Sequence, residues 1–331
     1  MACYPHRRPV LRSILALAAL LVTVLPSSVY TPLLQAAPSV FGQQSLFGSG
    51  SGLSGRAVAG DLDGDGDLDL VVGNGGRAGT PSQDVVYLND GEGAFQQGLL
   101  DCAATDRLRC FGTGDEDTAR IALGDLNGDG ALDIVVGVRR SCPLSAEDPN
   151  CDRPFGGQDA IYFNDGAGNF DRGALSCTQA LPRTRCFGTG SDNTSALAIG
   201  DLNGDGAFDI VSADLGGQSA LYLNDGVGGF ASGPLSCANN SRVVCVGGTD
   251  EGAASVAVAD ISGDSQLDIV VASLYGNDVV YLNQTTTPGA RPSFAALPFD
   301  QGSEQSTSVV AGDLDGNRTV DLAVGSPGQD Y

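Results

Sequence analysis

Oxygen-bearing side chains recur at fixed spacing in five nine-residue segments, at residues 61–69, 125–133, 201–209, 260–268 and 313–321. Positions 1, 3, 5 and 9 carry side-chain oxygens, position 7 offers a backbone carbonyl, and Gly at position 4 permits tight winding. Hard oxygen ligands in that number suit Ca²⁺, whereas Mg²⁺ demands stricter octahedral geometry and keeps more water. The candidate Ca²⁺ ligands are Asp61, Asp63, Asp65, Asp67, Asp69, Asp125, Asn127, Asp129, Ala131, Asp133, Asp201, Asn203, Asp205, Ala207, Asp209, Asp260, Ser262, Asp264, Gln266, Asp268, Asp313, Asp315, Asn317, Thr319 and Asp321.

These loops differ from an EF-hand, which has a bidentate Glu at position 12 and flanking helices. Position 12 holds Val in four copies and Ser212 in the third, inside an expected strand. Crowded carboxylates repel one another without a cation, so a metal would clamp the loop and have a structural rather than a catalytic role. The other interpretation, acidic turns without metal, weighs most for the last two copies, which have Ser262 and Ser265 or Asn317 and Arg318 within the motif.

Strand-like segments surround every loop. A short apolar segment precedes it, and a β-branched run follows, as in Leu68–Gly73. Four copies continue with a third strand that contains Tyr, and in the first three an Asn-Asp-Gly turn leads to an aromatic residue expected to open a fourth strand, at Phe95, Phe170 or Phe230. In the fourth copy Phe294 has that place.

Four antiparallel strands repeated radially predict an all-β fold, a β-propeller of about five blades with the last blade incomplete. Its fifth copy ends at Tyr331, where a third strand would begin. Two interpretations stay open: residues 41–47 complete that blade, or the chain is a fragment of a larger ring.

The composition excludes several kinds of site. All 17 cationic residues are Arg, the single His is His6, the single Met is Met1, and Trp is absent. These facts exclude a Ser-His-Asp or Cys-His centre, a Schiff-base Lys and a His-ligated metal in the chain beyond its N-terminus. A net charge of −23 and a pI near 4.1 argue against nucleic-acid or anionic-membrane partners.

The N-terminus has the pattern of a secretory signal peptide, assigned to residues 1–37. Three Arg precede an apolar run at 14–25, which is too short to span a bilayer, and no membrane span is expected after signal removal. Eight Cys lie beyond the signal peptide, and their spacing predicts four disulfides, which agrees with a secreted or cell-surface location. The alternative for these Cys is free thiols or a zinc site. The expected disulfides are Cys102–Cys110, Cys142–Cys151, Cys177–Cys186 and Cys237–Cys245.

The DxDGDGxxD loop, the preceding VAxGD, the following DIVVG and the YLNDGxGxF segment resemble the FG-GAP and VCBS repeats of integrin α-subunit propellers and secreted bacterial proteins. The resemblance covers nearly all of residues 41–331, and we assign 38–331 to one propeller domain. It implies that each loop joins the first and second strands of a blade and binds Ca²⁺.

The expected strand directions put the calcium loops on one face and the cysteine-bracketed inserts on the other. Nine arginines are expected with the inserts: Arg77, Arg107, Arg109, Arg139, Arg140, Arg153, Arg183, Arg185 and Arg242. The sequence favours an extracellular binding or adhesion module for a protein or polysaccharide, with an anionic ligand suggested by these arginines. The alternative is a secreted propeller-scaffold enzyme, a polysaccharide lyase or hydrolase.

Overall fold

The computed structural model describes residues 54–74, 83–96, 102, 107–112, 118–138, 157–172, 182–233, 235, 237–249, 252–300 and 305–327. The chain divides into two compact units, Met1–Gln44 and Ser45–Tyr331, and every described residue belongs to the second unit. The expected signal peptide and residues 41–47 therefore lie outside the described residues.

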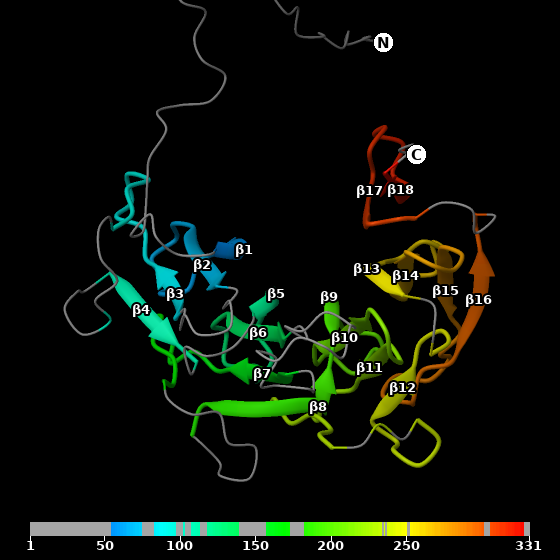
Figure 1. Cartoon of the computed structure of the whole chain (residues 1–331), viewed down its shortest axis with the longest axis horizontal. Helices are drawn as coiled ribbons and strands as arrows, with labels where there is room; N and C mark the ends of the chain where they lie inside the picture. Colours follow the sequence, from blue (N-terminus) through cyan, green and yellow to red (C-terminus); the bar gives the residue numbers. More distant parts are fainter. Residues whose placement is uncertain are drawn as a thin grey trace, which may run out of the picture. The chain divides into compact units, whose positions relative to one another are not determined.

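The described strands form five antiparallel sheets, which we number as blades one to five in chain order (Figure 1). The first four blades have four strands each, and in the fifth the structure describes two. Among the described residues there is no helix, and so none that could cross a membrane. The strands are, in blade one, β1 (Ser54–Gly60), β2 (Asp69–Asn74), β3 (Asp84–Tyr87) and β4 (Leu108–Phe111); in blade two, β5 (Thr118–Gly124), β6 (Asp133–Val138), β7 (Gly157–Tyr162) and β8 (Thr184–Asp192); in blade three, β9 (Thr194–Gly200), β10 (Asp209–Asp214), β11 (Ala220–Tyr222) and β12 (Val243–Cys245); in blade four, β13 (Ala253–Ala259), β14 (Asp268–Ser273), β15 (Val279–Asn283) and β16 (Phe294–Pro298); and in blade five, β17 (Ser308–Gly312) and β18 (Asp321–Gly325).

The hydrophobic core lies between adjacent blades. Side chains on a strand alternate between its faces, so Val71 and Val86 pack toward blade two while Val72 and Val85 belong to a cluster on the other face of blade one. Equivalent clusters join blades two and three, three and four, and four and five. Because both faces of the inner strands are buried, these strands read as continuous β-branched runs rather than alternating ones.

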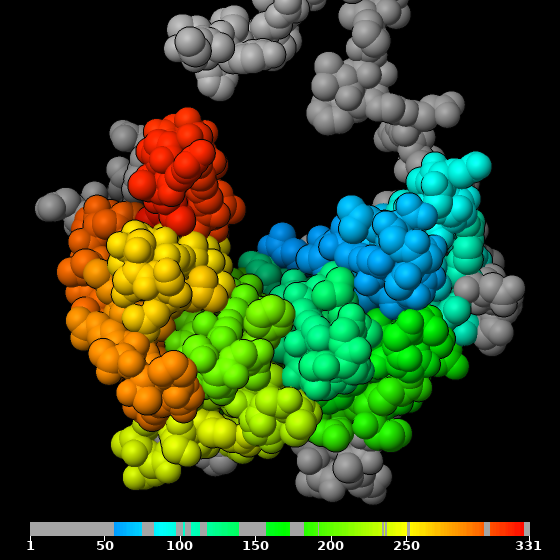
Figure 2. Space-filling view, turned by 180° about the vertical axis from the view of Figure 1, so that it is seen from behind, coloured from blue at the N-terminus to red at the C-terminus, as the bar shows by residue number. Residues whose placement is uncertain are grey.

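Neighbouring blades contact each other mainly through their first strands: β1 lies against β5, β5 against β9, β9 against β13, and β13 against β17. Figures 1 and 2 show the sheets side by side in chain order. The contact is close at the end of β1, where a Cβ on Gly60 would lie 2.7 Å from Leu123 Cδ1 and 2.8 Å from Leu132 Cδ1. This approach explains why glycine ends the first strand.

The all-β class and the four-stranded blade are confirmed, but one strand assignment is wrong. A fourth strand begins at Phe294, as expected, and none begins at Phe95, Phe170 or Phe230. In the first three blades the fourth strand comes later, after the cysteine-bearing connection, as β4, β8 and β12.

The turn aromatics have a different role, which explains the error. The ring of Phe170 lies 6.0 Å from that of Phe111, and the ring of Phe230 lies 6.4 Å from that of Phe187. In both pairs the second ring belongs to the fourth strand of the preceding blade. A pattern of apolar residues cannot distinguish a side chain that packs sideways into the next sheet from one that opens a strand.

The corrected strand order defines the two ends of each blade. The first strand ends, the second begins, the third ends and the fourth begins at the same end, which we call the loop end because it holds the nine-residue segments. At the opposite end of blades one, two and four, a buried Asp near the start of the third strand accepts a hydrogen bond from a hydroxyl group of the next blade. The bonds are Thr118 Oγ1 to Asp84 at 2.6 Å, Thr194 Oγ1 to Asp159 at 2.7 Å and Ser306 Oγ to Asp278 at 2.7 Å.

Candidate metal centre

The Asp at position 1 folds each loop around its own carboxylate. One oxygen accepts the backbone N–H of position 4 and the other accepts that of position 6. For Asp61 these bonds come from Gly64 at 2.8 Å and Gly66 at 3.0 Å. The same pair of bonds recurs at Asp125, Asp201, Asp260 and Asp313. All five segments therefore share one hydrogen-bonding pattern, including the two that depart from the motif.

Position 6 has a positive φ in every loop. It is Gly in the first three loops, with φ of 93° at Gly66, but Ser265 and Arg318 occupy it in the last two, with φ of 73° and 71°. A side chain in this left-handed region is strained, because Cβ approaches the following carbonyl. The last two loops thus pay a conformational cost to keep the same fold.

The Asp at position 9 ties the loop to the end of the third strand. In blade three, Asp209 accepts the backbone N–H of Leu202 at 3.0 Å and of Asn224 at 2.9 Å. The side chain is fully buried, and burial raises the pKa of Asp209 to about 7 and that of Asp133 to about 6. The same two-sided bonding occurs at Asp69, Asp133 and Asp268.

Three carboxylates converge in the first and the fifth loop. Oxygens of Asp61, Asp63 and Asp65 lie within 4.8 Å of one another, and the same holds for Asp313, Asp315 and Asp321. Burial raises the pKa of Asp63, and the nearby charges of Asp65 and Asp61 raise it further. The negative charges of the carboxylates in this loop therefore repel one another.

The second and third loops relieve the same crowding with an amide. Asn127 Nδ2 donates to Asp129 Oδ2 at 2.9 Å, and Asn203 Nδ2 donates to Asp205 Oδ2 at 2.8 Å. In the described loops two to four, three carboxylates do not gather as closely as in loops one and five.

The residues present fit a calcium ion. A carboxylate offers about four lone-pair sites, so those at positions 1 and 9 can accept their backbone N–H groups and still ligate a cation. All the candidate metal ligands are oxygen atoms, and the first loop brings three carboxylate oxygens close together.

Sequence reasoning missed the Asn that follows the third strand. Its side-chain amide reaches into the preceding blade: Asn164 Nδ2 donates to Leu62 O at 2.7 Å, Asn224 Nδ2 to Leu126 O at 2.7 Å, and Asn283 Nδ2 to Leu202 O at 2.8 Å. The acceptor is in each case the carbonyl at position 2 of a loop. The repeated YLN or YFN triplet is the available signal, although by itself it indicates only the start of a turn.

The predicted placement is wrong for the arginines that come just before a fourth strand. Arg107, Arg183 and Arg242 lie just before the fourth strand and hence at the loop end, where each pairs with the Asp of its blade's Asn-Asp-Gly turn. The ion pairs are Arg107–Asp90 at 3.2 Å, Arg183–Asp165 at 3.0 Å and Arg242–Asp225 at 3.2 Å. The cause is that the fourth strand begins later in the sequence than predicted. The segment between the Asn-Asp-Gly turn and this strand therefore returns to the loop end before the strand begins.

These pairs affect the acidity of the turn. Burial acts to raise the pKa of Asp225, but hydrogen bonds from Gly229, Val227 and Arg242 bring it below its ordinary value. Of the other arginines, Arg109 bonds Asn169 of the next blade and Arg185 covers the ring of Phe163. Four lie outside the described residues: Arg77, Arg139, Arg140 and Arg153.

Two of the expected disulfides are present in the described residues. Cys102 is bonded to Cys110 and Cys237 to Cys245, with Cα–Cα distances of 5.6 and 5.5 Å. Cys186 is also disulfide-bonded, while its expected partner Cys177 lies outside the described residues. The expected pair Cys142–Cys151 lies outside them as well.

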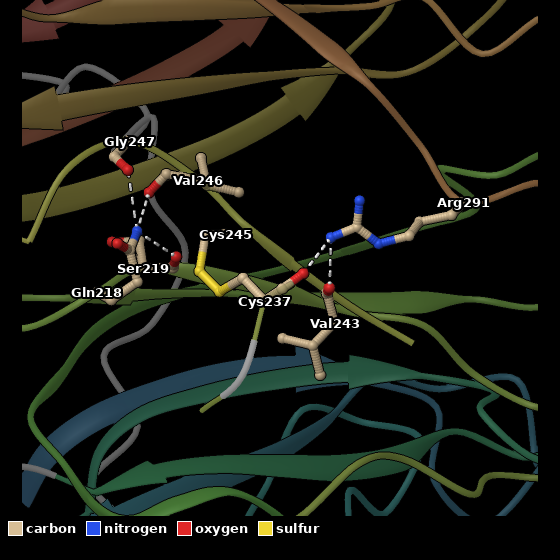
Figure 3. Close-up of a disulfide and its surroundings, with 8 residues drawn as sticks. All are labelled: Gln218, Ser219, Cys237, Val243, Cys245, Val246, Gly247 and Arg291. Carbon is tan, nitrogen blue, oxygen red and sulfur yellow. Dashed lines mark hydrogen bonds between the residues drawn. A yellow bond between two sulfur atoms is a disulfide. The ribbon is translucent and has the colours of Figure 1, made fainter. Parts of the chain in front are cut away.

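Each described disulfide holds a connection that a neighbouring blade contacts. Figure 3 shows Arg291 of blade four donating to the carbonyls of Cys237 and Val243, at 2.8 and 2.9 Å. Arg172 of blade two makes the equivalent bond to Cys102 O at 3.0 Å. In Figure 3, Gln218 binds the carbonyls of Val246 and Gly247 and so fixes the end of β12. The disulfides thus stabilise contacts between blades as well as within them.

Solved structures with a similar arrangement are distant. The V. cholerae biofilm matrix protein Bap1 is 17% identical with a TM-score of 0.43, over 82% of this chain and 35% of that one. BBS1N in its complex with ARL6DN is 13% identical with a TM-score of 0.42, over 83% and 64%. The Dos1 propeller is 12% identical with a TM-score of 0.39, over 81% and 65%. This chain spans about a third of the Bap1 chain and just under two thirds of BBS1N and Dos1. No curated protein matches it.

A family model for the FG-GAP-like repeat matches residues 61–136, 201–271 and 260–324, which together exceed half of the chain. Each matched segment begins at position 1 of a nine-residue loop and runs into the strands that follow. With its four-stranded blades, the chain belongs to the FG-GAP-like repeat family and has the β-propeller fold.

Proposed function

We propose that this protein is a secreted, calcium-binding β-propeller that acts as an extracellular binding module for a protein or polysaccharide ligand. The observation that carries the proposal is the recurrence of one oxygen-rich loop, with one hydrogen-bonding pattern, at the loop end of all five blades. A repeated site of this kind serves the scaffold, and a rigid scaffold presents loops to a ligand.

The calcium role follows from what the loop residues do. Position 1 shapes the loop, position 9 anchors it to the third strand, and positions 3 and 5 supply oxygens beside them. A bound divalent cation would supply positive charge to carboxylates that otherwise repel one another. Its expected effect is a more stable blade, because an ion that binds only the folded loop shifts the folding equilibrium.

The extracellular location is supported by the disulfides, which persist in oxidising compartments. The N-terminal pattern of a signal peptide agrees with it. Both features favour export, and the local disulfides would protect the connections at the outer strands in that environment.

The ligand class is constrained by the arginines. Those described at the loop end are already paired with Asp90, Asp165 and Asp225, so an anionic ligand would have to rely on other cations. Arg139 and Arg140 remain candidates for contacting a carboxylate or sulfate, because Arg binds such groups bidentately. In the sequence they come after β6 and before β7, outside the described residues.

The test is a glycan and matrix-protein array probed with the full chain in CaCl₂ and in chelator. We expect binding to at least one ligand class in calcium, with a loss in chelator that follows unfolding. Arg139→Ala/Arg140→Ala should weaken binding and its salt dependence without changing stability. No binding to any arrayed ligand by the folded, calcium-loaded protein would contradict a role as a binding module.

A further inference from the structure

The loops of successive blades are joined by a continuous series of hydrogen bonds. The series begins at Leu62 O in the first loop, which accepts from Asn164 Nδ2 at 2.7 Å. The backbone N–H of Asn164 donates to Asp133 at 3.0 Å, and Asp133 also accepts the N–H of Leu126 at 2.9 Å. Leu126 is position 2 of the second loop, so the path has moved from one loop to the equivalent residue in the next.

The same steps repeat twice more. Leu126 O accepts from Asn224 Nδ2 at 2.7 Å, and the backbone N–H of Asn224 donates to Asp209 at 2.9 Å. Leu202 O then accepts from Asn283 Nδ2 at 2.8 Å, and Asn283 N–H donates to Asp268 at 2.7 Å. The path therefore passes through the position 9 residue of each loop that it enters.

The side chains of the linking asparagines are held in one orientation. Asn164, Asn224 and Asn283 are 2%, 4% and 4% exposed, and a second bond from each amide goes to the position 8 carbonyl of its own blade. A buried amide with both N–H groups engaged has one favoured orientation, since any rotation would leave a polar group unpaired. The side chain can thus transmit order from one loop to the next.

We propose that Asn164, Asn224 and Asn283 are positioning residues that couple the metal loops of adjacent blades, so that filling one loop raises the calcium affinity of the next. The inference rests on the proposed calcium role of the loops. A cation orders the peptide at position 2, that peptide fixes the Asn, and the Asn holds the position 9 carboxylate of the following loop ready for its own ion. A first ligand that orders part of the second site lowers the entropic cost of the second binding event.

Blade one offers a matched control. Asn89 has the same place after the third strand and caps the same turn, through bonds from Gly91 and Gly93 to its Oδ1. Its side-chain amide donates to Leu68 O within its own blade, at 3.0 Å. Asn89→Ser and Asn224→Ser thus remove the same local contact, but only the second removes a described bond to another loop. Serine retains an oxygen for the turn and is too short to reach the carbonyl.

The experiment measures hydrogen–deuterium exchange of the third loop, residues 201–209, as CaCl₂ is added to the full chain. Asp129→Ala disables the second loop. In the wild-type background this change should shift the calcium midpoint for protection of the third loop upward by roughly threefold to tenfold, the equilibrium value of one net hydrogen bond. Asn224→Ser should cause a similar shift by itself, and adding Asp129→Ala should then have no further effect. Asn89→Ser should leave the midpoint and the coupling unchanged.

Two results would overturn the coupling: an unchanged midpoint when the second loop is disabled, or a full shift that persists in the Asn224→Ser background. If Asn224→Ser does not fold, Asn283→Ser gives the same test between the third and fourth loops. A wild-type protein in which no loop gains protection with calcium would instead contradict the calcium role itself. That result is distinguishable, because loss of coupling leaves every loop responsive to calcium.

Discussion

Replacing Asp by Asn at position 3 of a loop should stabilise the protein in chelator and destabilise it in calcium. The reverse replacement should have the opposite effects. In the first loop, Asp63 lies among the carboxylates of Asp61 and Asp65, within 4.8 Å. Unit charges at about 4 Å in water repel by about 1 kcal/mol, and we use this solvent-screened value because the loop is largely exposed. Asp63→Asn retains the oxygen that accepts the N–H of Asp65. It should therefore stabilise the chelated protein by up to about 1 kcal/mol.

In calcium the same change should destabilise the protein, because the site loses one charged ligand. An ion at a hundred times its dissociation constant stabilises by about 2.7 kcal/mol, and a tenfold weaker site reduces this to about 1.4 kcal/mol. Asn127→Asp in the second loop is the reverse experiment. It removes the bond from Asn127 Nδ2 to Asp129 and adds a like charge, so it should destabilise in chelator and bind calcium more tightly. Urea unfolding of both variants in each condition is the assay, and a shift of one sign in both conditions would refute this reasoning.

Three further changes test other parts of the structure. Removing the disulfide with Cys237→Ser/Cys245→Ser, at a sequence separation of 8, should cost roughly 2–3 kcal/mol on the chain-entropy model, measured by urea unfolding against the oxidised wild type. Ser265→Gly and Arg318→Gly should each stabilise by about 0.5–1 kcal/mol, because they relieve a positive φ, and a lower unfolding midpoint for both would contradict the strain argument. Burial raises the pKa of Asp159 well above its ordinary value, so its contribution is favourable below about pH 4 and is lost as pH rises. Between pH 5 and pH 8, wild type should lose stability relative to Asp159→Asn, and parallel pH profiles would count against it.

The sequence was sufficient for the elements that carry a periodic signal. The nine-residue loops, the strands on either side of them and the blade were predictable, because Asp, Gly and β-branched residues recur in register. The local Cys pairs were predictable for the same reason, and Cys102–Cys110 and Cys237–Cys245 are confirmed.

The sequence was insufficient where a side chain acts between blades. Phe170 and Phe230 were assigned to new strands, although they pack on the preceding blade, and this error moved Arg107, Arg183 and Arg242 to the wrong end. The linking asparagines were missed for a related reason. Contacts across 81 to 102 residues of sequence leave no local periodicity from which to infer them.

The central claim is that the five loops bind calcium and thereby stabilise the propeller. Thermal unfolding of the full chain in CaCl₂, in MgCl₂ and in chelator, at equal ionic strength, tests it most directly. We expect the midpoint to rise in calcium, to rise much less in magnesium, and to return to the chelated value when calcium is removed, because the loop oxygens suit the larger ion. Equal midpoints in calcium and in chelator would contradict the account.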